Sequence, residues 1–246
     1  MAAFIFLYGC SSEKNSALVF RANGEDFVRQ GFIDKQGWAI AFDTVLVHLS
    51  DIAAYNKKEG LRAELQGNFA VDLAAGDDNA IPVKVGTVDN VAAGNYQSLK
   101  FKVTKATAGE YRGSSIVMTG KAIKDSLSIP FIIKINETMT FTCTEGYVGD
   151  EIKGIVKEDS VADVEMTFHF DHIFGDNDAP MDNHINSSSV GFDFFYQYRD
   201  GGKVAVSQSE LKQDDEYETF VRALWSLGHC GEGHCEVSEQ STELHD

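Results

Sequence analysis

The chain has 246 residues, and 43% of them are hydrophobic, which is enough to build a substantial buried core. Thirty-eight acidic and 21 basic residues give it a formal net charge of −17 at pH 7. Because an acidic surface repels phosphate backbones, we expect no nucleic-acid partner. The longest apolar run, residues 2–8, is far shorter than the roughly 20 residues that cross a bilayer as a helix.

The N-terminal residues are typical of a bacterial lipoprotein. The apolar run ends in Leu7-Tyr8-Gly9-Cys10 before a polar stretch, an order that resembles a lipobox. In such a motif the chain is cut before the cysteine, whose thiol receives a lipid. We therefore expect a signal segment at 1–9, lipid on Cys10 and a flexible tether at 10–24, which predicts a periplasmic or outer-membrane lipoprotein of the cell envelope. The alternative is a buried N-terminal strand with an ordinary cysteine.

Residues 25–206 carry the pattern of an all-β domain. Short stretches rich in β-branched and aromatic residues recur about every ten residues, and turn-forming residues separate them. No helical pattern alternates with them, so we predict an antiparallel Ig-like or transthyretin-like β-sandwich. The expected strands lie at residues 37–49, 69–73, 81–85, 98–104, 115–121, 127–135, 138–143, 161–170 and 191–198.

The stretch at 161–170 shows the clearest alternation of apolar and polar residues. Apolar side chains from Val164 to Phe170 should face the core, which turns Glu165, Thr167 and His169 to solvent. The polar residues 175–189 come next and predict a long surface loop.

Residues 207–246 predict one C-terminal amphipathic helix, a turn rich in histidine and cysteine, and a loose tail. Ser207 and Glu210 have the spacing of a capping box, and the helix should stop at Gly228. Its apolar stripe should pack on the sandwich, and the stripe consists of Phe220, Val221, Leu224 and Trp225.

Several of these segments together resemble a known family, the DUF4382 family of bacterial lipoproteins. The resemblance covers about residues 37–172 and implies a lipid-anchored β-sandwich, with no chemistry attached. A weaker likeness, carried by Phe168-His169-Phe170, is to the MbnP-like periplasmic copper-protein domains, and it transfers no site. The segments that carry the first resemblance are Gly37-Trp38, residues 39–49, Val71-Asp72-Leu73, Ala92-Ala93-Gly94-Asn95-Tyr96 and residues 164–171.

Two His-Cys pairs, His229-Cys230 and His234-Cys235, surround a Gly-Glu-Gly turn. Imidazole and thiolate groups this close could ligate one soft cation. Outside the cytoplasm, however, neighbouring cysteines usually oxidise, so we favour a disulfide between Cys230 and Cys235 over a thiolate metal site. Cys143 would then remain a buried, inert thiol.

A second donor set lies in His169-Phe170-Asp171-His172 and the loop after it. On a strand, His169 and Asp171 share one face and His172 lies on the other, unless the strand ends and the chain turns His172 back. His184 and the loop aspartates could join them; aspartates alone would suit calcium, whereas imidazole with carboxylate suits zinc or copper. Surface histidines beside an acidic loop are the alternative.

The sequence therefore favours a non-enzymatic, lipid-anchored protein that binds or delivers zinc or copper. No nucleophile, phosphate-binding or dinucleotide-binding motif supports an enzyme. The alternative is an adhesion or interaction module of the envelope with a protein partner and no metal. The candidate ligands, expected to meet at one end of the domain, are His169, Asp171, His172, His184, His229 and His234.

Overall fold

The computed structural model describes residues 15–76, 81–143, 153–230 and 233–239, and most of them are in β-strands. Residues 1–9 and Cys10, the expected signal segment and lipid site, lie outside these ranges. None of the helices in the described ranges is long and apolar enough to cross a membrane.

A five-stranded sheet contains the first described strand of the chain, which lies between the central strand and one edge strand. Residues 17–23 form this strand, with all but two of its side chains buried, so the tether expected at 10–24 is wrong for this part. Transfer of the apolar side chains of this segment from water to the core lowers the free energy, and this holds the segment in the sheet. In spatial order the strands are β17 (Gly233–His234), β16 (Gly228–Cys230), β13 (Val161–Phe168), β1 (Ala17–Asn23) and β6 (Val83–Asp89).

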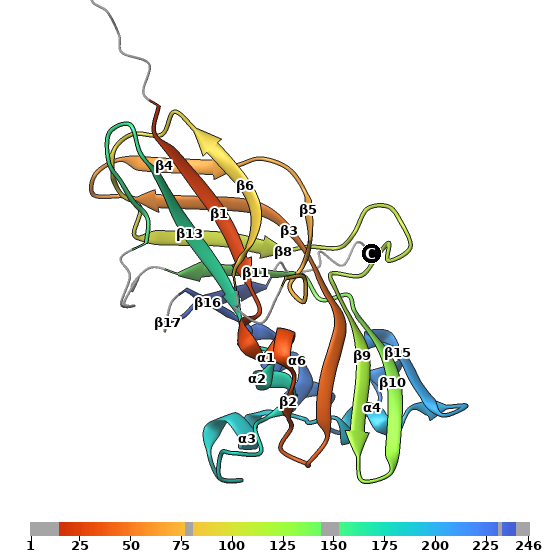
Figure 1. Ribbon diagram of the computed structural model, residues 1–246. Coiled ribbons are helices and arrows are strands. Elements are labelled where there is room, and N and C mark those ends of the chain that lie inside the picture. The colour runs from red at the N-terminus through yellow and green to blue at the C-terminus, as the bar shows by residue number, and fades with distance from the viewer. Residues whose placement is uncertain (1–14, 77–80, 144–152, 231–232, 240–246) are drawn as a thin grey trace, which may run out of the picture.

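The larger sheet is organised around β3 (Ala39–Asn56), a strand of 18 residues that begins where expected and runs well past residue 49. In Figure 1, β3 begins in an arm that it shares with β9 and β10 and runs into the layer beneath β1 and β13. In spatial order the main strands of this sheet are β14 (Arg199–Asp200), β15 (Lys203–Ser207), β10 (Leu127–Ile135), β9 (Ile116–Lys124), β3, β8 (Ser98–Val103), β11 (Met139–Cys143) and β18 (Glu236–Glu239). β2 (Phe32–Ile33), β4 (Leu61–Leu65) and β5 (Phe69–Asp72) also pair with β3, while β12 (Ile155–Val156) pairs separately with β7 (Gly94–Asn95).

One hydrophobic core joins the two large sheets. Phe101 of β8 stacks on Phe141 of β11 with ring centroids 5.2 Å apart, and it meets the edge of Phe168 from β13 at 5.6 Å. All three rings are buried, and Figure 1 shows the smaller sheet crossing over β8 and β11. The expected strands at 98–104, 138–143 and 161–170 thus lie where the two layers meet.

The sheets are mixed, which corrects the expectation of antiparallel pairing throughout. β1 pairs in parallel with β13, and β10 pairs in parallel with β15. Both pairs join segments far apart in the chain. Turn signals between neighbouring strands predict hairpins, but they carry no information about such distant partners.

Two other expectations fail where helices form. The aromatic segment at 191–198, expected as a strand, contains the short helix α4 (Asp193–Tyr196), because consecutive aromatic side chains are buried there on several sides. The single C-terminal helix is divided into α5 (Gln208–Leu211), which has the expected capping box, and α6 (Tyr217–Trp225). The remaining helices are α1 (Glu25–Gln30), α2 (Asp171–Phe174) and α3 (His184–Ser188), the last of them inside the expected loop 175–189.

The C-terminal segment belongs to the same body. β16 pairs with β13 and β18 pairs with β11, so residues 228–230 and 233–239 are neither a separate region nor a loose tail. Glu165 and Thr167 on β13 are buried rather than facing solvent, and the Glu165 carboxylate is held there by Asn23 and Lys153.

The disulfide joins Cys143 to Cys235, which corrects the expected pair Cys230 and Cys235. In the hairpin of β16 and β17, Cys230 pairs with Gly233 and the backbone of Cys235 bonds to Gly228, so the two cysteines are diagonal neighbours. The Cα atoms of diagonal residues lie roughly 7–8 Å apart. A disulfide can join two cysteines only when their Cα atoms are within about 7 Å of each other. Cys143 is thus not the inert thiol expected, since its Cα lies 4.4 Å from that of Cys235.

Gly228 allows the Phe141 ring to lie directly on the backbone of β16. A Cβ added at this position would overlap the ring. We expect Gly228→Ala to lower the free energy of unfolding by about 1–3 kcal/mol, as measured by urea denaturation. In a Phe141→Leu background the same change should cost less, and equal costs in both backgrounds would contradict this account of the contact.

Candidate metal centre

The pairing of β13 with β16 brings together histidines 60 residues apart in the sequence. Thr167 pairs with His229, and His169 lies two positions after Thr167, where the backbone N–H of His169 donates to Leu227 O at 3.0 Å. Residues two apart lie on the same face of an extended chain. The rings of His169 and His229 therefore stack, with centroids 3.9 Å apart and planes 16° from parallel.

Two further histidines, His172 and His234, lie close to this stacked pair and close to each other, with ring centroids 5.5 Å apart. β13 ends at Phe168, and the chain then turns into α2, so that His172 comes back to the ring of His229 with centroids 5.2 Å apart. This is the alternative in which the strand ends and the chain turns His172 back. His234 pairs with His229 across the hairpin, with ring centroids 4.0 Å apart.

His169, His172 and His229 present one nitrogen each within 4.8 Å of the other two. Zinc–nitrogen bonds are about 2.0–2.1 Å long, so small side-chain movements would bring the three nitrogens onto one ion. His172 Nδ1 lies 2.8 Å from Ser226 Oγ, which leaves Nε2 of that ring for a metal. A polar group behind a ligating imidazole fixes the orientation of the ring.

His229 is the most confined member of the cluster. It is only 3% exposed, and within the described ranges neither of its ring nitrogens makes a hydrogen bond of good geometry, although the backbone of Ser226 is near enough to raise its pKa. Leaving a buried polar group without a partner costs about 1–3 kcal/mol, and such groups are rare in folded proteins. A cation among the rings would satisfy one of these nitrogens.

Burial keeps the imidazoles neutral. It lowers the pKa of His172 to about 4 and that of His229 to about 3, and the neighbouring histidines contribute to both shifts. Neutral imidazole has a lone pair for a metal, whereas imidazolium has none. At neutral pH these two side chains are therefore in the form that binds metal.

Two carboxylates border the cluster. Glu25 Oε1 lies 3.4 Å from His169 Nε2, and the hydrogen bond to His169 is the main reason that the pKa of Glu25 is lowered. Asp171 is placed by α2, where burial raises its pKa and one carboxylate oxygen, Oδ1, has no partner among the described residues. A carboxylate behind a metal-binding histidine is a common feature of metal sites.

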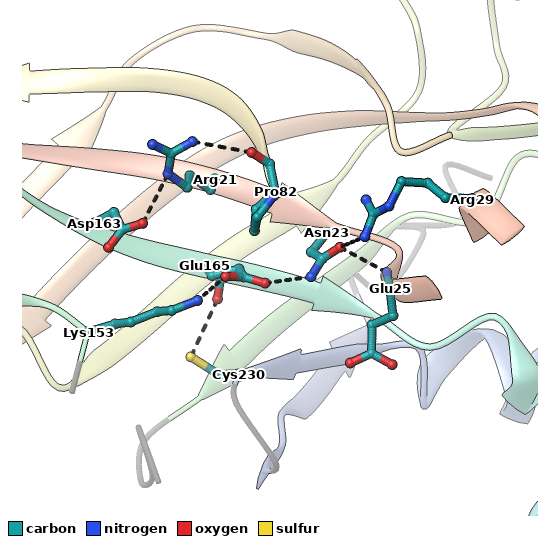
Figure 2. A network of polar contacts seen from close by, with 9 residues as sticks. All are labelled: Arg21, Asn23, Glu25, Arg29, Pro82, Lys153, Asp163, Glu165 and Cys230. Atoms are coloured by element: carbon teal, nitrogen blue, oxygen red, sulfur yellow. Dashed lines mark hydrogen bonds and ion pairs between the residues drawn. The ribbon is translucent and has the colours of Figure 1, made fainter. Parts of the chain in front are cut away.

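Glu25 is held in place by a polar network that crosses β1 and β13 (Figure 2). Asn23 Oδ1 accepts from the backbone N–H of Glu25 and from Arg29 Nη2, both at 2.9 Å, while its Nδ2 donates to Glu165 Oε1 at 2.8 Å. Glu165 in turn forms an ion pair with Lys153. Glu25 has a φ of +59°, an unfavourable value for a residue with a side chain, so the network compensates for local backbone strain.

The other expected ligands lie at the edge of this cluster or outside it. His184 begins α3, is exposed, and interacts electrostatically with His172 and His234. Asp178 and Asp182 are exposed, and no calcium-like group of aspartates occurs in the described ranges. The expected meeting of the two histidine segments is therefore seen most clearly for His169, His172, His229 and His234.

The cysteines contribute no thiolate to the cluster. Cys235 is in the disulfide, and the Cys230 thiol donates to Glu165 O at 3.8 Å. The donor set is thus imidazole with nearby carboxylate, and thiolate ligation by the His-Cys pairs finds no support in this geometry.

Comparisons with protein-family models, curated proteins and solved structures found no match. The likenesses to the DUF4382 family and to MbnP-like domains stay predictions. The function must be inferred from the geometry of the site.

Sequence reasoning missed Glu25 and Ser226. Both contact a histidine only through the tertiary fold, since Glu25 is 144 positions from His169 and Ser226 is 54 positions from His172. Asn23-Gly24 indicates a turn before Glu25, but nothing in the sequence links this turn to the histidines.

The metal-free protein should lose stability as the pH falls from about 6.5 toward 4. His172 and His229 have lower pKa values when folded than the ordinary 6.5, so in this range the unfolded chain binds more protons and the free energy of unfolding decreases. Urea midpoints measured in chelator at pH 7, 6, 5 and 4.5 would show the decline. His229→Gln should make it shallower, and a midpoint that stays constant down to pH 5 would contradict the assignment.

Proposed function

We propose that this chain binds one divalent transition metal ion, zinc or copper, through His169, His172 and His229. The observation that carries the proposal is the buried His229 ring, which makes no hydrogen bond of good geometry in the described ranges and lies against two other imidazoles. Burial of an unsatisfied imidazole costs free energy when no ligand is bound, and the position of the ring is already suited to binding an ion. When bound, the ion would supply a bond to one of the buried ring nitrogens of His229.

The donor set favours zinc or copper over the alternatives. Imidazole suits these two metals, whereas calcium and magnesium prefer oxygen ligands and monovalent copper prefers sulfur. Glu25 adds negative charge close to His169, which offsets the charge of a divalent cation. The exposed His234 at the rim suits a protein that passes its metal on, because an incoming ligand could reach the ion there.

The proposal also includes the cell-envelope setting. The lipobox-like residues before Cys10 support a lipid anchor in the periplasm or outer membrane, and the absence of catalytic motifs supports a binding or delivery role rather than an enzyme. We further propose that the two packed sheets are a variant of the Ig-like or transthyretin-like sandwich. An envelope protein could serve as the acceptor of the metal.

Metal analysis of the purified protein tests the central claim. After incubation with zinc or copper and removal of excess ion, we expect about one ion per chain, in line with one group of three histidines. His229→Ala should abolish stoichiometric binding. Glu25→Gln removes the charge behind His169 and should weaken binding roughly 10- to 100-fold.

His48→Asn is the matched control, because it alters a histidine of β3 that is outside the cluster. It should bind metal as the wild type does. If the wild type retains neither zinc nor copper, the metal proposal fails, and an envelope interaction module without metal becomes the better account.

Mass spectrometry of the protein from its native membrane tests the anchor separately. We expect a mature N-terminus at Cys10 carrying a diacylglycerol, because the preceding residues resemble a lipobox. A chain that begins at an unmodified Met1 would refute the anchor and leave the metal proposal untouched.

A further inference from the structure

We propose that the Cys143–Cys235 disulfide controls the affinity of the metal centre by holding His234 in place as a fourth ligand. This inference rests on the proposed function. It adds both a ligand and a redox dependence, which the group of three histidines does not by itself imply.

His234 lies outside the group whose nitrogens are within 4.8 Å of one another, but it borders that group, and a movement of its ring toward the ion would complete a four-imidazole site. Its ring centroid lies 4.0 Å from that of His229 and 5.5 Å from that of His172. His229 is buried on β16, which pairs with strands on both sides, whereas His234 is exposed on β17, an edge strand of two residues. Zinc is usually four-coordinate in proteins, so a fourth imidazole at this position would close the site.

The hairpin alone gives His234 little support. β17 pairs with β16 through two residue pairs, and one further backbone hydrogen bond runs from Cys235 N to Gly228 O at 3.1 Å. β17 is the edge strand of its sheet and pairs on one side only, and ordering the backbone of each residue costs roughly 1–2 kcal/mol in conformational entropy. The position of His234 must therefore depend on the residues immediately C-terminal to it.

The disulfide begins at the very next residue. Cys235 bonds covalently to Cys143, the buried last residue of β11, and Glu236 then pairs with Thr142 as β18 extends along the same strand. The chain is thus tied to the larger sheet immediately after His234. When the disulfide is formed, the backbone between His234 and the core has little conformational freedom.

The disulfide acts by position and not as a ligand. Successive side chains on a strand point to opposite faces, so the sulfur of Cys235 lies on the other side of the hairpin from the His234 ring. A dithiol reductant would give two electrons and two protons to the disulfide, break the Sγ–Sγ bond and leave Cys143 and Cys235 as thiols. The dithiol itself would become a disulfide, and the site would keep three well-held imidazoles and one loosely held one.

Both cysteines are buried, so the redox states are best compared with variants. Zinc affinity would be measured by competition with a chromogenic chelator for wild type, Cys143→Ser/Cys235→Ser, His234→Ala and the triple variant that combines all three changes. Cys230→Ser is the matched control, since it removes a neighbouring thiol and leaves the disulfide intact.

We expect His234→Ala and the double serine variant each to weaken zinc binding roughly 10- to 100-fold, a range typical for groups that complete or orient a metal site. The triple variant should be no weaker than His234→Ala, because both changes remove the same ligand. Cys230→Ser should bind as the wild type does. In Cu(II)-loaded protein, electron paramagnetic resonance should report one fewer coordinated nitrogen in both His234→Ala and the double serine variant.

Three results would overturn the inference. One is wild-type affinity in His234→Ala, which keeps the disulfide and stays decisive even if the serine variants fail to fold. Another is wild-type affinity in the double serine variant. The third is an additive loss in the triple variant, which would mean that the disulfide acts through general stability. Failure of the wild type to bind zinc or copper would instead reject the proposed function itself.

Discussion

The pairing of β13 with β16 is the constraint on which the candidate site depends. It is short, with two residue pairs in register, yet it joins the C-terminal segment to the centre of the five-stranded sheet. The register places His229 opposite Thr167 and therefore beside His169. A slip of one residue would turn His229 to the other face of the strand and leave the cluster without its buried member.

The cluster works against the stability of the fold. His229 and Asp171 each bury polar atoms that make no hydrogen bond of good geometry in the described ranges, and Glu25 has a strained backbone conformation. Each feature costs free energy, and such costs persist only where the surrounding structure forces them. Here the network from Asn23 to Lys153 and the packing of Phe101, Phe141 and Phe168 supply that support. These unfavourable features all lie around one group of imidazoles. Such a grouping is expected of a ligand-binding site and not of histidines scattered on a surface.

Much of the β-structure can be predicted from local sequence, whereas the site can be predicted only in part. The strand at 127–135 has the predicted bounds, because alternation and turn residues determine it locally. The sequence also indicates the histidines as a group. It does not reveal the parallel partner of β1 or the disulfide of Cys143, since each depends on register between distant segments. The strand prediction for the aromatic run at 191–198 is wrong because burial on several sides removes the alternation that separates a strand from a helix.

The long-range pairings also restrict how the chain can fold. β1 near the N-terminus needs β13, some 140 residues later, as its parallel neighbour, and β11 receives β18 and its disulfide partner only from the last described residues. Contacts between residues so far apart in the sequence form slowly. The chain must first lose the conformational entropy of closing a long loop, and only then do the contacts begin to stabilise it. A chain that is still being synthesised therefore lacks strands of both sheets until β16 and β18 have emerged, and folding must await them. Until then the open edges of β1 and β11 are exposed to other chains, so the same topology that assembles the histidines creates an interval in which the protein depends on protection from aggregation.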